Sequence, residues 1–312
     1  ADAAEAEGPG GAAGAGGADP ELLIAALRPP GECGEEAGAL QAHLERAAPM
    51  LPRAVGARVA TLLLGAPPPP DHLSAVLAQS RAVQGDAGLL LLLRSMDPLL
   101  WYSDDWRPLF RDWKDGQSFG ALVGGTMHYG GPALLVVRTA DGHLVGAVSS
   151  SWRELNGKFG GGADCFLFSV TPTLQVMRGS GRSQNYMYFN SKNRHAPRGI
   201  GFGGQAEMCR LWLDSDFERC HVLESDATYQ EGRLLPGDDY QIPLECACVE
   251  VWGCGGAEAA EAQGEQRSRD QGLRDQARKV DRARMLETEF DKEVLFEKAF
   301  AKGSASKHTD QC

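Results

Sequence analysis

A glycine-rich stretch from Gly199 to Gly204 has the GxGxxG spacing of dinucleotide-binding loops. Such a loop binds pyrophosphate when a strand precedes it and a helix follows it within a βαβ unit. Here the polar run 193–198 precedes the glycines, and the residues after Gln205 lead into a Leu-Trp-Leu strand. We therefore interpret the glycines as positions of positive φ or close backbone approach, and we predict no dinucleotide cofactor.

Cys246 and Cys248 stand at CxC spacing, with Cys254 after them and Cys220-His221 before them, a set that contains zinc-ligand residue types. On a strand, residues 246 and 248 point to the same face, and the chain has no paired CxxC hairpins. We predict reduced, metal-free thiols. The Ala/Gly/acid tract at the start has no basic and apolar regions of a secretory signal, which favours a reducing, cytoplasmic location.

Other reactive side chains form no recognisable catalytic arrangement. The candidates are the serines Ser149, Ser150, Ser151 and Ser180, the thiol of Cys165, and the carboxylates Asp214, Asp216 and Glu218. No serine lies in a nucleophile elbow, and no histidines stand at i, i+4 spacing around a carboxylate. The acidic cluster follows a strand and is typical of a solvated turn. We predict that the protein is not an enzyme; a hydrolase or redox enzyme using Cys165 or the acidic cluster stays as an alternative.

The composition excludes some classes of partner. A formal charge of −11 argues against nucleic acid, because binding phosphates needs a positive field. The most hydrophobic run, Leu89 to Leu93, is far too short to span a membrane. With 43% apolar residues the chain can still bury a substantial core. Any membrane association is therefore expected to be peripheral and to pass through a partner.

The N-terminal part of the chain is predicted to be helical. Residues 1–19 are almost entirely Ala, Gly and acid and are predicted to be disordered. Residues 20–100 form a helical module, in which apolar residues repeat at three-to-four spacing around 22–27, 40–47 and 55–63. Prolines 67–70 break this pattern, and further helices are expected over 72–82 and 86–96.

Residues 101–254 have the pattern of an antiparallel sheet protein. Short apolar runs are separated by Gly, Pro, Asn and Asp, without the length that helical crossovers need. The predicted strands are 133–138, 144–148, 165–170, 174–178, 185–189, 211–214 and 247–252. Asp141-Gly142 predicts a hairpin between the first two. The expected fold class is α+β, with a two-sheet β-sandwich flanked by helices.

The last part, residues 255–312, is predicted to be a linker followed by one long helix over Glu265–Phe300. In its final turns, apolar side chains occupy nearly every side of the helix and do not form a single stripe. Packing on one sheet face would leave some of these side chains exposed, so we predict that they bind a partner. The predicted partner-binding residues are Leu286, Phe290, Val294, Leu295, Phe296 and Phe300. Folding back onto the N-terminal helices is the alternative.

The segment from Trp101 to Gly253 resembles the TLDc domain family throughout its length. The resemblance is carried by Asp115–Phe119, Asp141–Ala147, Ser151-Trp152, Cys165–Phe168, Gly199–Gly204, Leu211–Phe217, Thr228-Tyr229 and Val249–Gly253. Within the family, Asn185–Asn190 and Gly199–Gln205 look most like the branch of mTOR-associated lysosomal TLDc proteins. Asp226 departs from the family pattern, which commonly has a cysteine before the Thr-Tyr pair.

The resemblance implies a sandwich flanked by helices and a role in oxidative-stress resistance or mTOR-linked signalling. It also implies a regulatory adaptor that binds the vacuolar proton ATPase at the lysosome or vacuole surface. It provides no catalytic or cofactor-binding residues to transfer. A structural component of a cytoskeletal or ciliary complex is the alternative function.

Overall fold

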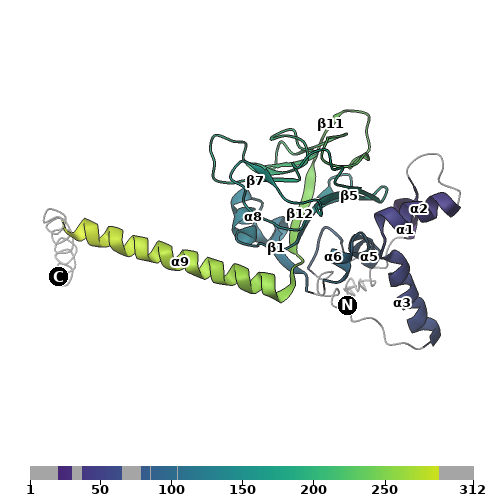
Figure 1. Ribbon diagram of the computed structural model, residues 1–312, viewed down its shortest axis with the longest axis horizontal. Helices are drawn as coiled ribbons and strands as arrows, with labels where there is room; N and C mark the ends of the chain where they lie inside the picture. The colour runs from purple at the N-terminus through teal and green to yellow at the C-terminus, as the bar shows by residue number, and fades with distance from the viewer. Residues whose placement is uncertain (1–19, 30–36, 65–78, 85, 104, 288–312) are drawn as a thin grey trace, which may run out of the picture. The chain divides into compact units, whose positions relative to one another are not determined.

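The computed structural model describes residues 20–29, 37–64, 79–84, 86–103 and 105–287. The chain divides into two compact units, residues 1–260 and residues 261–312. The described helices are α1 (Pro20–Leu27), α2 (Ala37–Ala47), α3 (Leu51–Leu64), α5 (Ala87–Ser95), α6 (Pro98–Trp101), α7 (Asp112–Asp115), α8 (Phe119–Thr126) and α9 (Gly256–Glu287) (Figure 1). Residues 1–19, for which we predicted disorder, lie outside the described residues.

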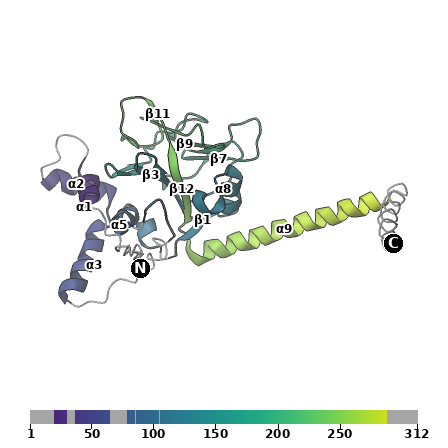
Figure 2. The same ribbon diagram turned by 180° about the vertical axis from the view of Figure 1, so that it is seen from behind.

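Side-chain caps explain where two of these helices begin. Asp86 accepts hydrogen bonds from the amides of Gly88 (2.8 Å) and Leu89 (3.1 Å) at the start of α5. Ser118 accepts one from Ala121 (3.1 Å) at the start of α8, which lies beside β1 in both views (Figure 2). Helix α5 confirms the helix that we predicted over residues 86–96.

Twelve described strands form two antiparallel six-stranded sheets. The first, the inner sheet, has the order β1-β12-β2-β3-β5-β6, and the second, the outer sheet, has the order β11-β10-β9-β8-β7-β4. The inner strands are β1 (Arg107–Arg111), β2 (Ala133–Thr139), β3 (Leu144–Ser149), β5 (Phe166–Thr171), β6 (Gln175–Arg178) and β12 (Cys246–Gly253). The outer strands are β4 (Phe159–Gly160), β7 (Met187–Asn190), β8 (Gly199–Phe202), β9 (Leu211–Asp214), β10 (His221–Leu223) and β11 (Gln241–Pro243). The predicted α+β fold class is confirmed.

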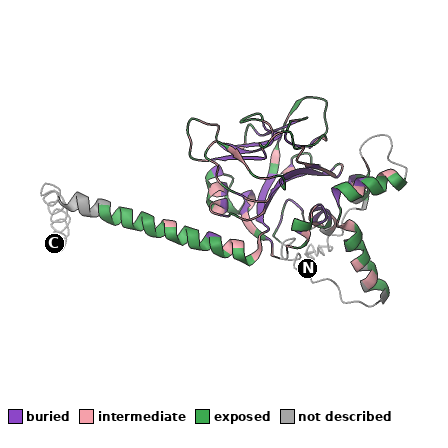
Figure 3. Ribbon diagram, in the orientation of Figure 1, coloured by how far each residue is buried: buried purple, intermediate pink, exposed green. Residues whose placement is uncertain are grey.

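The hairpin predicted at Asp141-Gly142 joins β2 to β3. The amide of Gly142 donates to the carbonyl of Thr139 (3.0 Å), and Gly142 has a φ of +84°, which the glycine adopts without strain. Strands β2, β3 and β5 are buried on both faces and appear purple over most of their length (Figure 3). The inner sheet is therefore a central layer.

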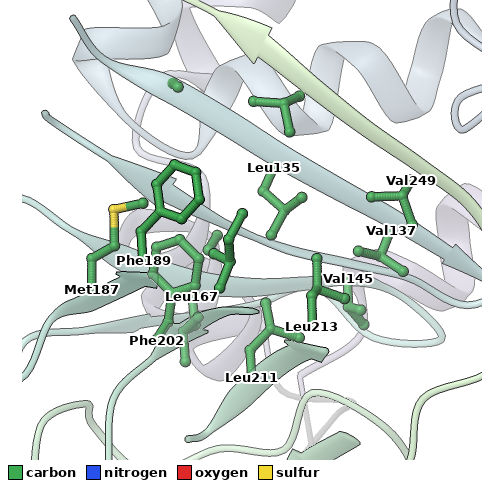
Figure 4. Packing of buried hydrophobic residues seen from close by; sticks show 14 of the residues in the cluster. Leu135, Val137, Val145, Leu167, Met187, Phe189, Phe202, Leu211, Leu213 and Val249 are labelled. Carbon is green, nitrogen blue, oxygen red and sulfur yellow. The ribbon is translucent and has the colours of Figure 1, made fainter. Parts of the chain in front are cut away.

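One face of the inner sheet packs against the outer sheet. Leu135, Val137 and Val145 of the inner sheet meet Phe189 and Leu213 of the outer sheet in a single apolar cluster (Figure 4). Trp152 adds edge-to-face ring contacts, with its centroid 6.1 Å from that of Phe189. This cluster is the core of the sandwich.

The opposite face of the inner sheet packs against helices. Leu134, Val136 and Phe168 alternate with the sandwich-core residues along their strands, and they contact the buried side chains of α5 such as Leu89 and Leu93. Helix α3 contributes little to this layer, since Val55, Val59, Leu62 and Leu63, the apolar residues that predicted the helix, are exposed.

A single buried carboxyl joins the helical layer to the inner sheet. Glu250 of β12 is 0% exposed, and its two oxygens accept hydrogen bonds from five nitrogen or hydroxyl donors. These donors are the Ser80 hydroxyl (2.7 Å), the amides of Arg81 (2.8 Å) and Ala82 (3.3 Å), and the indole N–H groups of Trp113 and Trp252 (3.0 Å each).

This carboxyl also explains why the helix predicted over residues 72–82 is wrong in its described part. Residues 79–84 form a turn region, and the earlier part lies outside the described residues. The amides of Arg81 and Ala82 point at Glu250 and not at helical carbonyl groups.

Helix α9 begins at Gly256, nine residues before the position that composition predicted. Residues 271–280 are all exposed, as Figure 3 shows in green. Pairs such as Arg269–Glu265 (3.2 Å) lie along its surface. No helix among the described residues is long and apolar enough to cross a membrane.

We predict that Glu250→Gln lowers the free energy of unfolding by about 3 kcal/mol, because an amide N–H would replace one acceptor and face buried donors. Urea denaturation of the full chain measures this change. Glu245→Gln, at an exposed position just before β12, is the matched control and should change stability by less than about 0.5 kcal/mol. Equal effects of the two substitutions would contradict the role of Glu250.

Candidate functional site

An open groove of about 1070 Å³ lies beside the edge strand β6. Its walls come from the end of α2, from β6, and from the loops around residues 180–182 and 225–231. These segments are far apart in the sequence, and the fold brings them together where the helical module meets the inner sheet.

The rim of the groove is strongly charged and of mixed sign. Arg46 and Arg182 are exposed and form no ion pair with another described residue. Arg178 is paired with Asp97 at 2.7 Å. Glu45 and Glu231 are also exposed on the rim. A rim of this kind suits a polar protein segment better than an apolar small molecule.

Under the rim lies a buried ion pair between Arg210 and Asp226, whose side chains are 0% and 2% exposed and 3.1 Å apart. Burial lowers the pKa of Arg210, while the adjacent Asp226 raises it. The guanidinium also donates to the carbonyl of Gly232, but its Nε has no acceptor among the described residues. A pair held this tightly positions the loop after β10.

His43 of α2 is the second buried polar group at the groove. Its Nε2 has no hydrogen-bond partner among the described residues. Burial lowers the pKa of this imidazole, and the nearby Arg46 lowers it further. The lowered pKa favours the neutral imidazole at pH 7, and the Nε2 atom is itself buried, so this ring adds no charge to the groove.

The structure explains the glycine-rich stretch without a cofactor. Gly199 and Gly201 lie in β8, where a Cβ on Gly201 would come within 2.3 Å of the Cys209 sulfur. Gly203 and Gly204 follow with φ of +74° and +65°. Both interpretations from the sequence, close approach and positive φ, are confirmed. The amide of Gly204 already donates to the Asp226 carboxylate (3.0 Å), whose charge would repel a phosphate.

The expectation that Cys246 and Cys248 share one face is wrong. A β-bulge between them shifts the register, so that Cys246 pairs with Thr139 and Cys248 with Arg138. Cys246 consequently packs against the sandwich core, and Cys248 lies in the helical layer. The six described cysteines are free thiols. The described residues contain no group of three or more His, Cys, Asp or Glu side chains that could hold a metal ion.

Of the remaining candidates from the sequence, Ser180 lines the groove, where its hydroxyl donates to the carbonyl of Ala227 (2.6 Å), and the others lie apart from it. Asp214 is buried and accepts from the amide of Asp216 (3.2 Å) in a turn, whereas Asp216 and Glu218 are exposed. Cys165 is buried beside the hydroxyl of Ser149, with sulfur and oxygen 3.7 Å apart. Neither position places a nucleophile beside a base in an accessible cavity.

Sequence reasoning missed the groove. Its residues come from four separate segments and form no motif. The one sequence signal was Asp226, which departs from the family pattern. The structure gives a reason for this residue, since its carboxylate binds Arg210 and the Gly204 amide. Of the predicted partner-binding residues, Leu286 lies in the last turn of α9, while Phe290, Val294, Leu295, Phe296 and Phe300 lie outside the described residues.

Comparison with known proteins assigns most of the described fold to one family. The TLDc domain model matches residues 89–255, which includes most of α5 and both sheets. MTOR-associated protein MEAK7 of Danio rerio is 36% identical over 170 residues, covering 53% of this chain and 37% of that protein. The human protein of the same name is 34% identical over 152 residues, covering 48% of this chain and 32% of that protein.

Oxidation resistance protein 1 of Xenopus tropicalis is similar at lower identity, 28% over 149 residues, covering 47% of this chain and 16% of that protein. The matched part of the chain spans about a third of the length of its MEAK7 relatives. The comparisons therefore bear on the sandwich and not on the activity of whole relatives.

We predict that the glycine-rich turn binds no nucleotide, because Asp226 occupies the amide that a phosphate would need. Isothermal titration of the full chain with NAD, FAD and ATP should give no Kd below about 1 mM, or about −4 kcal/mol. Saturable micromolar binding that inorganic pyrophosphate displaces would contradict this prediction.

Proposed function

The chain belongs to the TLDc domain family, and on this premise we propose that it is a non-catalytic regulator that docks on a large protein assembly. The vacuolar proton ATPase is the first choice of assembly, and a cytoskeletal or ciliary complex is the second. Two kinds of relative, one named for association with mTOR and one for oxidation resistance, support a role in mTOR-linked signalling or the oxidative-stress response.

The groove beside β6 is the observation that carries the proposal. It is open, polar and rimmed by Arg46 and Arg182, which have no ion-pair partner among the described residues. On a chain of net charge −11, these two arginines offer positive contacts for acidic side chains of a protein segment, beside the rim carboxylates Glu45 and Glu231. The buried Arg210–Asp226 pair holds one wall rigid, so little ordering is needed on binding.

Helix α9 adds a second contact in this proposal. Its described part exposes Leu273 and Val280 among charged residues, and the sequence continues to the apolar set Leu286, Phe290, Val294, Leu295, Phe296 and Phe300. A partner that surrounds the helix would cover apolar side chains on several sides. Docking through these two surfaces would place the protein in the cytoplasm, at the lysosome or vacuole surface when its partner is there.

We predict that the groove is needed for docking. Reversing both rim charges in Arg46→Glu with Arg182→Glu should reduce recovery of the partner assembly about tenfold, since like charges would face its acidic segment. Affinity purification from cells with quantitative mass spectrometry measures the recovery. Arg153→Glu with Lys158→Glu reverses two exposed charges outside the groove and serves as the control. Equal recovery with both pairs of substitutions contradicts the assignment of the groove.

Deletion of residues 265–312 tests the second contact. We expect the thermal midpoint of the remaining chain to fall by less than about 2 °C, because residues 1–260 form a compact unit of their own. Recovery of the assembly should be lost. A truncated chain that loses several degrees of stability and still recovers its partners would instead show that the segment packs within the molecule. Recovery of cytoskeletal or ciliary proteins by the full chain would favour the second choice of assembly.

A further inference from the structure

The β-bulge in β12 turns Cys246 toward a second thiol. Because of the bulge, Cys246 packs against the sandwich core while Cys248 faces the helical layer. Cys220, which directly precedes β10, is buried in that same core and is 4% exposed. The two sulfur-bearing side chains therefore enter one apolar cluster from opposite sheets.

The backbone brings these two residues near each other. His221 of β10 pairs with Pro243 of β11, and the amide of Leu244 donates to the carbonyl of Cys220 (2.9 Å). Cys246 follows two residues after Leu244, where the chain has passed from the outer sheet into β12 of the inner sheet. Its sulfur lies 3.6 Å from the Leu244 carbonyl oxygen, and the interaction between the two thiols is the first cause of the pKa shift of each.

The surroundings of the two sulfurs are unequal. The hydrogen bond from Cys246 lowers the pKa of Cys220, burial opposes this, and the backbone amide of Asp214 lowers the pKa further. The same thiol–thiol hydrogen bond raises the pKa of Cys246, and burial raises it further. Cys220 is thus the better nucleophile of the pair, and Cys246 holds its proton.

For three other described thiols the first cause is burial and not a second thiol. Burial is the largest cause that raises the pKa of Cys209, Cys248 and Cys254. The sulfur of Cys209 donates to the Gln205 carbonyl at 3.1 Å, and that of Cys254 to the Trp252 carbonyl at 3.7 Å. Cys246 is also the one described cysteine that is only half-buried, so a small oxidant can reach the pair from its side.

We propose that Cys220 and Cys246 are a redox modification site, at which a hydroperoxide converts two thiols into a disulfide that links the two sheets. The Cys220 thiolate attacks the peroxide, forming an S–O bond as the O–O bond breaks, and an alcohol or water leaves after taking up a proton. The Cys246 sulfur then attacks the Cys220 sulfur, the S–S bond forms, and the hydroxide leaves as water with the proton of Cys246. Two electrons pass from the thiols to the peroxide, and a thiol reductant reverses the change.

Peptide mapping of the full chain tests the proposal. The protein is treated with hydrogen peroxide, alkylated, and digested without reduction. We expect a cross-linked peptide pair that contains Cys220 and Cys246, a loss of two titratable thiols, and full recovery of both thiols with dithiothreitol. A disulfide between other cysteines, or oxidation that leaves Cys220 and Cys246 alkylated, would overturn the proposal, and neither result depends on the folding of a variant.

Two matched variants separate this pair from general thiol oxidation. Cys248→Ser, two residues away on the other face of β12, should still form the disulfide. Cys246→Ser should lose it and leave Cys220 as a sulfenic acid that dimedone labels. Loss of the cross-link in Cys248→Ser would contradict the assignment. So would a disulfide between other cysteines in Cys246→Ser, with no dimedone label on Cys220.

Discussion

The carboxyl group of Glu250 is wholly buried, so its oxygens must be satisfied by donors that the fold brings to it. Those donors come from the turn at Ser80–Ala82, from Trp113 in α7 and from Trp252 in its own strand. One side chain thereby sets the path of the chain into α5, the position of α7 and the orientation of an indole. The turn precedes the family match, which begins at residue 89, so Glu250 ties the N-terminal helices to the TLDc sandwich.

The central position of the inner sheet determines which sequence predictions could succeed. Strands β2, β3, β5 and β12 were predictable within a few residues because strands buried on both faces are short apolar runs bounded by turn residues. When both faces of a strand are buried, apolar and polar residues no longer alternate along it. The sequence then does not show which face of the sheet a side chain occupies. A bulge of one residue between Cys246 and Cys248 therefore left no signal, although it reversed one side chain.

Other elements were hidden by residues with strong local preferences. Gly199–Phe202 was not among the predicted strands because glycine is rare in strands, yet it forms β8, where Trp212 and Cys209 leave no room for a Cβ. Strand β1 was not predicted because it contains Pro108, which lacks a backbone N–H. This proline is tolerated because β1 lies at the edge of the inner sheet. The groove could not be predicted, because His43, Arg178, Arg210 and Glu231 share no local pattern and meet only in the folded chain.

Glu250 and Asp226 use the same device at two places: an internal carboxylate takes the backbone amides that could otherwise bind a ligand. Such amides bind anions in many nucleotide sites, but here a carboxylate of the protein itself already accepts their hydrogen bonds. What the described fold leaves available is therefore charged side chains on its outside, at the groove rim and along α9. Contacts of that kind depend on salt and provide specificity and fast association.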